Sequence, residues 1–116
     1  MHYLKESAEI QTQIAKFALA KVLWLDTEVA DCNTYYPRLS LIQVLAKPTD
    51  STGEFAYIID VLDKPDLAAL FINQIMTSSQ IEKVFHNASF DLKYLGGNSA
   101  QNITCTLKLA RKISKV

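Results

Sequence analysis

Three apolar runs that follow one another with only turn-length connections place the strongest constraint on how this chain can fold. Residues 22–25 form an unbroken run of strand-forming side chains, residues 39–45 partly alternate between apolar and polar, and residues 55–59 form a third run. Turn-forming residues lie between them at 31–34 and 47–53. Because short turns join antiparallel strands, the pattern predicts an antiparallel meander whose first strand is covered on both faces.

Helical periodicity brackets this meander. Apolar residues recur at three- and four-residue steps over residues 6–20 and 65–76, and the second of these helices begins at a proline. The pattern further predicts a strand at 81–85, a short helix at 90–95 that ends at two glycines, and a helix at 106–114. A meander followed by βα units predicts an α/β protein with a mixed sheet and flanking helices. This order of elements resembles the ribonuclease H-like fold.

The composition is that of one folded domain. The 116 residues are 49% hydrophobic and carry equal numbers of acidic and basic side chains, so a single domain is expected over residues 1–116. No apolar run approaches the ~20 residues that a membrane-spanning helix needs. Cys32 and Cys105 are too few for a disulfide framework and lack the spacing of a zinc site, and no signal peptide is recognisable. We therefore expect a reduced, cytoplasmic protein with no membrane partner.

Two acidic residues, Asp26 and Glu28, follow the first predicted strand directly. On an extended backbone, residues two apart point to the same face, with Cα atoms about 6.5–7 Å apart. Carboxylate oxygens are the ligands that hard cations such as Mg²⁺ and Mn²⁺ prefer. The pair is therefore a candidate metal site, although Asp-x-Glu triplets also occur by chance at solvated strand ends.

A third acidic residue, Asp91, follows the fourth predicted strand and lies where a short helix starts. If that strand lies beside strand 22–25, Asp91 can point back at Asp26 and Glu28 and complete a group of three carboxylates. The alternative is a structural role, because an aspartate in the first turn of a helix complements the helix dipole.

Four segments of the chain, taken in order, resemble motifs of the DEDD exonuclease superfamily, and most closely of its ribonuclease D-like branch. Residues 23–28 resemble the first motif, a strand followed by Asp-x-Glu, and residues 36–44 resemble the strand after it. Residues 83–92 resemble the second motif, which contains Asp91, and residues 104–111 resemble the start of the helix beyond it. The resemblance extends from about Lys21 to Arg111.

The resemblance implies a 3′-5′ exonuclease in which four acidic side chains hold two divalent cations, Mg²⁺ or Mn²⁺, about 3.5–4 Å apart. Three of the four ligands correspond to Asp26, Glu28 and Asp91. One cation would activate water and both would stabilise the transition state, releasing nucleoside monophosphates from the single-stranded 3′ end of RNA or DNA. Since clustered carboxylates repel one another, we expect the site to stay loosely ordered or partly protonated until cations bind.

The resemblance also implies substrate contacts at Thr27, Leu41, His86, Asn87 and Phe90. Considered as residues alone, His86 is better explained as a structural, hydrogen-bonded histidine, and Leu41 as a residue of the core. In the loop after the first strand, Tyr35, Tyr36 and Arg38 could stack on or pair with a substrate strand. Packing within their own loop is the alternative for these three side chains.

The chain departs from the family pattern after Asp91, where the third motif pairs a Tyr or His with a later Asp. Tyr94 is followed four residues on by Asn98, and no such pair occurs up to Val116. We therefore expect a C-terminally truncated exonuclease domain that lacks the fourth ligand and is weakly active or inactive.

A non-catalytic nucleic-acid-binding or protein-interaction module on the same fold is the alternative function. Truncation would also leave apolar side chains of the sheet uncovered, and exposed apolar patches recruit partners. We therefore expect a homodimer through the uncovered face, with helix 106–114 as a candidate for exchange between the copies.

Overall fold

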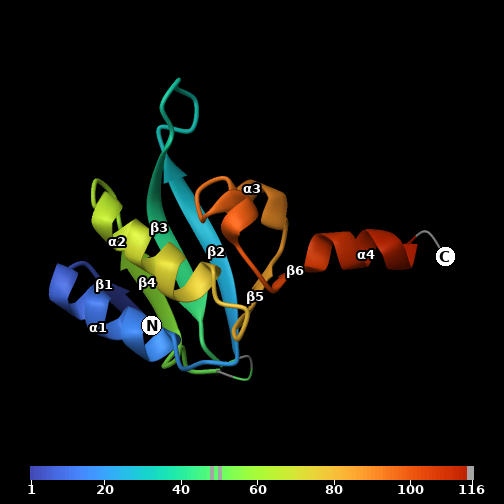
Figure 1. The fold of residues 1–116 in the computed structure, drawn as a ribbon, viewed down its shortest axis with the longest axis horizontal. Helices are drawn as coiled ribbons and strands as arrows, with labels where there is room; N and C mark the ends of the chain where they lie inside the picture. Colours follow the sequence, from blue (N-terminus) through green and yellow to red (C-terminus); the bar gives the residue numbers. More distant parts are fainter. Residues whose placement is uncertain (48, 50, 115–116) are drawn as a thin grey trace.

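A meander of three antiparallel strands forms the centre of the protein, as the spacing of the apolar runs predicts. The computed structural model describes residues 1–47, 49 and 51–114, and Pro48 and Asp50 of the predicted 47–53 turn lie outside these described residues. The meander consists of β2 (Val22–Ala30), β3 (Arg38–Leu45) and β4 (Ala56–Asp60). It occupies the middle of a mixed sheet with the order β1-β4-β3-β2-β5-β6 (Figure 1).

Parallel strands complete the sheet on both sides of the meander. The predicted fourth strand is β5 (Glu82–Phe85), which pairs with β2, and β6 (Ile103–Cys105) pairs with β5 in turn. On the far side, β1 (His2–Leu4) pairs with β4. The sequence did not predict β1 or β6, because strands of three residues are too short to show a periodic pattern.

The first strand of the meander is longer than the predicted 22–25. Its ladder with β3 runs without interruption from Trp24, opposite Leu45, to Glu28, opposite Leu41, and continues to Ala30 after a register shift. Asp26 and Glu28 therefore lie within β2 and do not follow it. The prediction was wrong because charged side chains were taken to end the strand, whereas a strand with one solvated face accommodates them.

Two helices cover one face of this sheet. Figure 1 shows α1 (Ser7–Phe17) and α2 (Pro65–Phe71) crossing the same side, and α2 continues as a π-helical turn (Ile72–Met76). The core lies between these helices and the inward side chains of the meander, which include Leu23, Leu25, Ile42, Val44 and Ile59. Most of these side chains are branched aliphatics, which pack well on a pleated surface.

The opposite face of the meander carries no fully buried side chain. We call it the open face and define it by Trp24, Asp26, Glu28, Leu41, Gln43, Leu45 and Ile58, each of which is half-buried or exposed. The cross-strand register brings these residues together from three strands. The acidic pair of β2 thus shares its face with apolar side chains that no helix covers.

The remaining helices lie beyond β5. The predicted helix at 90–95 is found as α3 (Ala88–Leu92), which begins two residues earlier and ends three residues earlier, because Asn87 in the left-handed region precedes it and a turn follows Leu92. The predicted helix at 106–114 is confirmed as α4 (Thr106–Ser114), which has no buried residue and extends away from the sheet (Figure 1). Over residues 1–47, 49 and 51–114, no helix has the length and apolar character needed to cross a membrane.

Candidate active site

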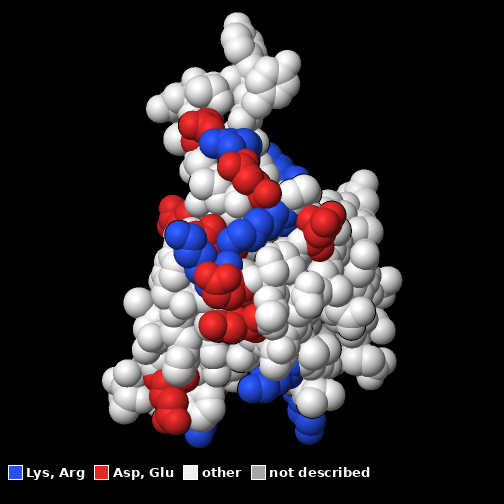
Figure 2. All heavy atoms as spheres, turned by 90° about the vertical axis from the view of Figure 1, so that its left-hand side faces the viewer, with Lys and Arg blue, Asp and Glu red and all other residues white. Residues whose placement is uncertain are grey.

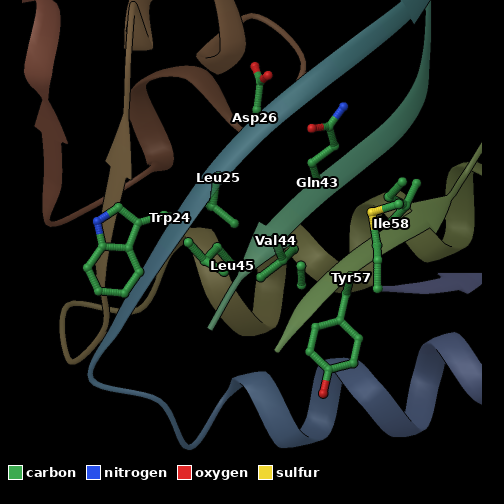
Figure 3. A pocket seen from close by; sticks show the side chains of 10 residues that line it. Trp24, Leu25, Asp26, Gln43, Val44, Leu45, Tyr57 and Ile58 are labelled. Carbon is green, nitrogen blue, oxygen red and sulfur yellow. The ribbon is translucent and has the colours of Figure 1, made fainter. Parts of the chain in front are cut away.

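The alternation of β2 places Asp26 and Glu28 together on the open face. Both side chains are exposed. Thr27, which lies between them, and Leu25, which precedes Asp26, point to the face of the sheet that the helices cover. On β3, Gln43 lies directly opposite Asp26 and Leu41 directly opposite Glu28. Figure 3 shows the side chains of Asp26 and Gln43 on neighbouring strands, pointing to the same side. The predicted orientation of the acidic pair is confirmed.

Asp91 reaches the same segment from the other direction. Because β5 pairs in parallel with β2, the helix that follows β5 starts close to the middle of β2. The hydroxyl of Thr27 donates a hydrogen bond of 2.6 Å to Oδ1 of Asp91, and the amide of Thr27 lies 2.9 Å from Oδ1 of Asp26. Thr27 therefore links the two carboxylates, although 64 residues separate it from Asp91.

The surroundings of Asp91 oppose its negative charge. The side chain is 3% exposed, and burial is the largest influence on its pKa, which is raised above the ordinary value. The hydrogen bond from Thr27 acts in the opposite direction, while the charge of Asp26 adds to the increase in the pKa. A neighbouring cation would offset both the burial and the repulsion.

The three carboxylates do not form a ready-made metal cage. Among residues 1–47, 49 and 51–114, no group of three or more His, Cys, Asp or Glu side chains is placed to hold an ion. Asp26 and Glu28 face the open side, whereas Asp91 is directed at Thr27. The donor set, carboxylate oxygens alone, still fits a hard divalent cation.

The family assignment follows from comparison with known proteins. A family model described as 3′-5′ exonuclease matches residues 1–116. The chain belongs to the 3′-5′ exonuclease family. Ribonuclease D from Shewanella sp. (strain ANA-3) is 31% identical over 91 residues, which cover 78% of this chain and 21% of that protein. The chain thus spans about a fifth of the length of this relative.

Solved structures of exonucleases share the fold. Escherichia coli RNase D superposes with a TM-score of 0.68 at 26% identity, covering 95% of this chain and 28% of that chain. The Aedes aegypti Nibbler EXO domain superposes with a TM-score of 0.74 at 16% identity, covering 98% of this chain and 56% of that chain. Together with the Shewanella relative, these neighbours confirm the ribonuclease D-like branch of the DEDD superfamily and the ribonuclease H-like α/β fold.

Two of the substrate contacts expected for this exonuclease family lie on opposite sides of the sheet. Leu41 is half-buried on the open face beside Glu28, and it is Ile42 that enters the core. Thr27, also an expected substrate contact, is 6% exposed, and its hydroxyl is directed at Asp91. The sequence could not show this, because the partner of Thr27 depends on how β5 and α3 pack.

The other expected contacts of the exonuclease lie around the start of α3. His86 is exposed with Nδ1 at 2.8 Å from Oγ1 of Thr106, and Asn87 is exposed in the left-handed region with φ of 81°. Phe90 is 41% exposed, and its ring lies 5.8 Å from that of Tyr94. All three expected residues therefore present solvent-accessible surface next to the buried Asp91.

Sequence reasoning missed two neighbours of these residues. The ammonium of Lys93 lies 5.7 Å from the ring centre of Phe90, within the range of a cation–π contact. Gln43 faces Asp26 across the β2–β3 ladder. The alternation of residues 39–45 indicates that Gln43 lies on the polar face of its strand. Its position opposite Asp26 depends on the register of the two strands, which no local sequence pattern specifies.

Proposed function

We propose that this chain provides the metal-binding half of a two-metal-ion 3′-5′ exonuclease that hydrolyses phosphodiester bonds at single-stranded 3′ ends of RNA or DNA. The observation that carries the proposal is the Thr27–Asp91 hydrogen bond, which joins the first and second acidic motifs of a 3′-5′ exonuclease fold. Members of this family depend on divalent cations, and we propose Mg²⁺ or Mn²⁺ here.

Asp26, Glu28 and Asp91 are the proposed ligands. When bound, the cations would supply a water of lowered pKa and positive charge at the phosphate that is attacked. The chain would supply carboxylate oxygens as ligands. β2 holds Asp26 and Glu28 on one face, and the Thr27 hydroxyl holds Asp91 next to the same segment of β2. We propose that Leu41, which lies opposite Glu28, packs against the terminal base.

The proposed substrate is supported by a relative that binds RNA. Trypanosoma brucei RNase D, 18% identical to this chain, has been crystallised in complex with RNA U12. In the present chain the exposed side chains of His86, Asn87 and Phe90 adjoin the acidic site and can contact phosphates and bases. No contact of these three side chains distinguishes one base from another, so we propose that the site recognises the end of a strand and not its sequence.

Low activity is part of the proposal. These 116 residues contain three of the four acidic ligands that the family pattern requires, and no Tyr or His paired with a later Asp follows Asp91. Three carboxylates can hold a cation, but no residue of the chain is assigned to orient the attacking water. We propose weak cation binding and slow turnover.

Self-association is proposed through the open face. Trp24, Leu41, Leu45 and Ile58 are half-buried there, and they form an apolar surface that no helix covers. A surface of this kind is commonly buried in a symmetric dimer. Because Asp26 and Glu28 share this face, a dimer would also restrict access to them.

A digestion assay tests the proposed activity. A 3′-labelled single strand of RNA or DNA is incubated with the chain in Mg²⁺ or Mn²⁺, alongside the variants Asp26→Asn and Glu54→Gln. We expect slow release of labelled mononucleotides that Asp26→Asn abolishes and that the exposed Glu54→Gln leaves unchanged. Binding of the strand with no release, by this chain and by any longer version of it, would instead establish the non-catalytic module.

A further inference from the structure

The hairpin between β2 and β3 presents two tyrosines that the fold itself does not use. Tyr35 is 98% exposed and Tyr36 is 84% exposed. The two rings therefore do not pack within their own loop, which was the alternative to substrate contact that the sequence left open. Folded proteins usually bury part of the large apolar surface of a tyrosine ring, so two adjacent rings that are almost fully exposed favour a function that needs their faces.

The loop holds these tyrosines in a defined position. Asp31, with φ of 57°, starts the turn, and its carbonyl accepts hydrogen bonds from the amide and the hydroxyl of Thr34 at 3.1 and 2.7 Å. The Thr34 hydroxyl in turn accepts a bond of 3.3 Å from the amide of Tyr36. A loop ordered in this way presents the two rings at a smaller entropic cost than a loose one.

Arg38 anchors the base of the same loop. Its guanidinium contacts the carboxylate of Asp31 at 2.8 Å and also pairs with Asp63, in the turn that follows β4. Figure 2 shows the uncharged tip projecting above this band of acidic and basic side chains. Because its guanidinium is paired with both Asp31 and Asp63, Arg38 stabilises the loop and is not available to bind a phosphate. The tip of the loop therefore offers aromatic rings and no positive charge.

The hairpin loop follows the acidic pair of β2 closely in the chain, and this proximity suggests what the loop binds. β2 runs from Asp26 and Glu28 directly into this loop, so that only Val29 and Ala30 separate Glu28 from its first residue (Figure 1). At the root of the loop, Arg38 and Tyr94 line the same surface pocket, and Tyr94 contacts the ring of Phe90. Two further rings, those of Phe90 and Tyr94, thus lie close to the root of the hairpin.

We propose that Tyr35 and Tyr36 form a stacking platform for the bases of the single-stranded nucleic acid whose 3′ end enters the acidic site. The proposal rests on the proposed exonuclease function. Base stacking on aromatic side chains tolerates any sequence, because every base has a π-face, and each stacked base contributes about 1–3 kcal/mol. The platform would hold the strand by its bases while the acidic site acts on its terminal phosphodiester.

Equilibrium binding in EDTA tests the platform without hydrolysis. Fluorescence anisotropy is measured with 5′-labelled U12 RNA, with the matching oligodeoxythymidylate, and with an abasic strand of the same length. We expect Tyr35→Ala and Tyr36→Ala each to weaken binding of the base-bearing strands about tenfold. Tyr35→Phe and Tyr36→Phe should bind as the wild type does, because they keep the ring. Leu19→Ala, which removes an 86% exposed apolar side chain outside the sheet and hairpin, is the matched control.

The outcomes separate this inference from the proposed function. Wild-type affinity in both alanine variants, with normal binding by the parent chain, would overturn the stacking platform and leave the exonuclease proposal intact. An equal loss of affinity for the abasic strand would also overturn the platform, since bases would not be its ligand. Failure of the parent chain to bind any of the three strands in EDTA would overturn the platform, whereas the exonuclease proposal would still be decided by the digestion assay in Mg²⁺ or Mn²⁺.

Discussion

At the scale of single residues, the contact between Thr27 and Asp91 is the feature on which the site depends. Thr27→Val keeps the shape of the side chain but leaves a buried carboxylate without its hydroxyl donor. Hydrogen bonds to charged groups contribute about 1.5–3 kcal/mol, so we expect a loss of that size in the free energy of unfolding, measured by urea titration. Thr27→Ser, which keeps the hydroxyl, should lose much less.

The same pair allows a double-mutant test. In an Asp91→Asn background no buried charge depends on Thr27, and the further cost of Thr27→Val should fall well below its cost in the wild type. Strictly additive losses would show that the contact does not couple the two residues.

A second residue-scale prediction concerns Lys83, whose side chain is 0% exposed and donates to the carbonyl of Ser78. Burial lowers its pKa, so between that lowered value and the ordinary value of about 10.4 the unfolded chain binds more protons than the folded one. The stability of the wild type should therefore rise with pH across this window. Lys83→Met should be more stable than the wild type near neutral pH, with an advantage that shrinks as the pH approaches about 10.

Urea unfolding at several pH values, with the exposed Lys16→Met as the control, measures this difference. The Lys16 variant should show no such trend. A Lys83→Met protein whose stability relative to the wild type does not change with pH would contradict the explanation.

At the scale of elements, the turn after α3 holds the helix that carries Asp91. Gly96 has φ of 103°, and a Cβ atom there would lie 3.1 Å from Oγ of Ser99 and 3.2 Å from a methyl carbon of Ile72. Gly97 has φ of 53°, and its nearest neighbour would be the Leu92 carbonyl at 3.9 Å. We expect Gly97→Ala to cost about 1 kcal/mol, the ordinary penalty of the left-handed region, and Gly96→Ala to cost clearly more in thermal unfolding. Equal costs would show that the turn around Gly96 is not tightly packed.

Long elements of this fold could be predicted from the sequence, while features that depend on pairing could not. The apolar runs that contain Leu25 and Val44 specify two strands of the meander, and the spacing of Asp26 and Glu28 specifies their common face. The end of β2 was predicted too early, because its ladder with β3 is a tertiary property. The hydrogen bond from Thr27 to Asp91 likewise depends on the packing of distant segments, which no local pattern encodes.

At the scale of the whole molecule, the open face is the surface through which we propose that the protein associates in solution. If the apolar side chains there meet in a symmetric dimer, light scattering should show a mass that increases with protein concentration. Leu45→Glu places a charge on this face beside Trp24 and should hold the protein as a monomer, whereas Leu19→Glu, at an exposed site outside the sheet, should not. A monomeric mass at every concentration for all three proteins would contradict self-association through this face.

Calorimetric titration with Mn²⁺ measures whether Asp26, Glu28 and Asp91 together bind a divalent cation, as we propose. The site consists of three carboxylates, two on the open face of β2 and one hydrogen-bonded to Thr27. Carboxylate oxygens suit a hard cation, so we predict weak but saturable binding. Asp26→Ala should abolish the heat of binding, and the exposed Glu54→Gln, which removes the same charge elsewhere, should leave it unchanged. A titration curve for Asp26→Ala that coincides with that of the wild type would contradict the account, because the cation would then bind outside the exonuclease site.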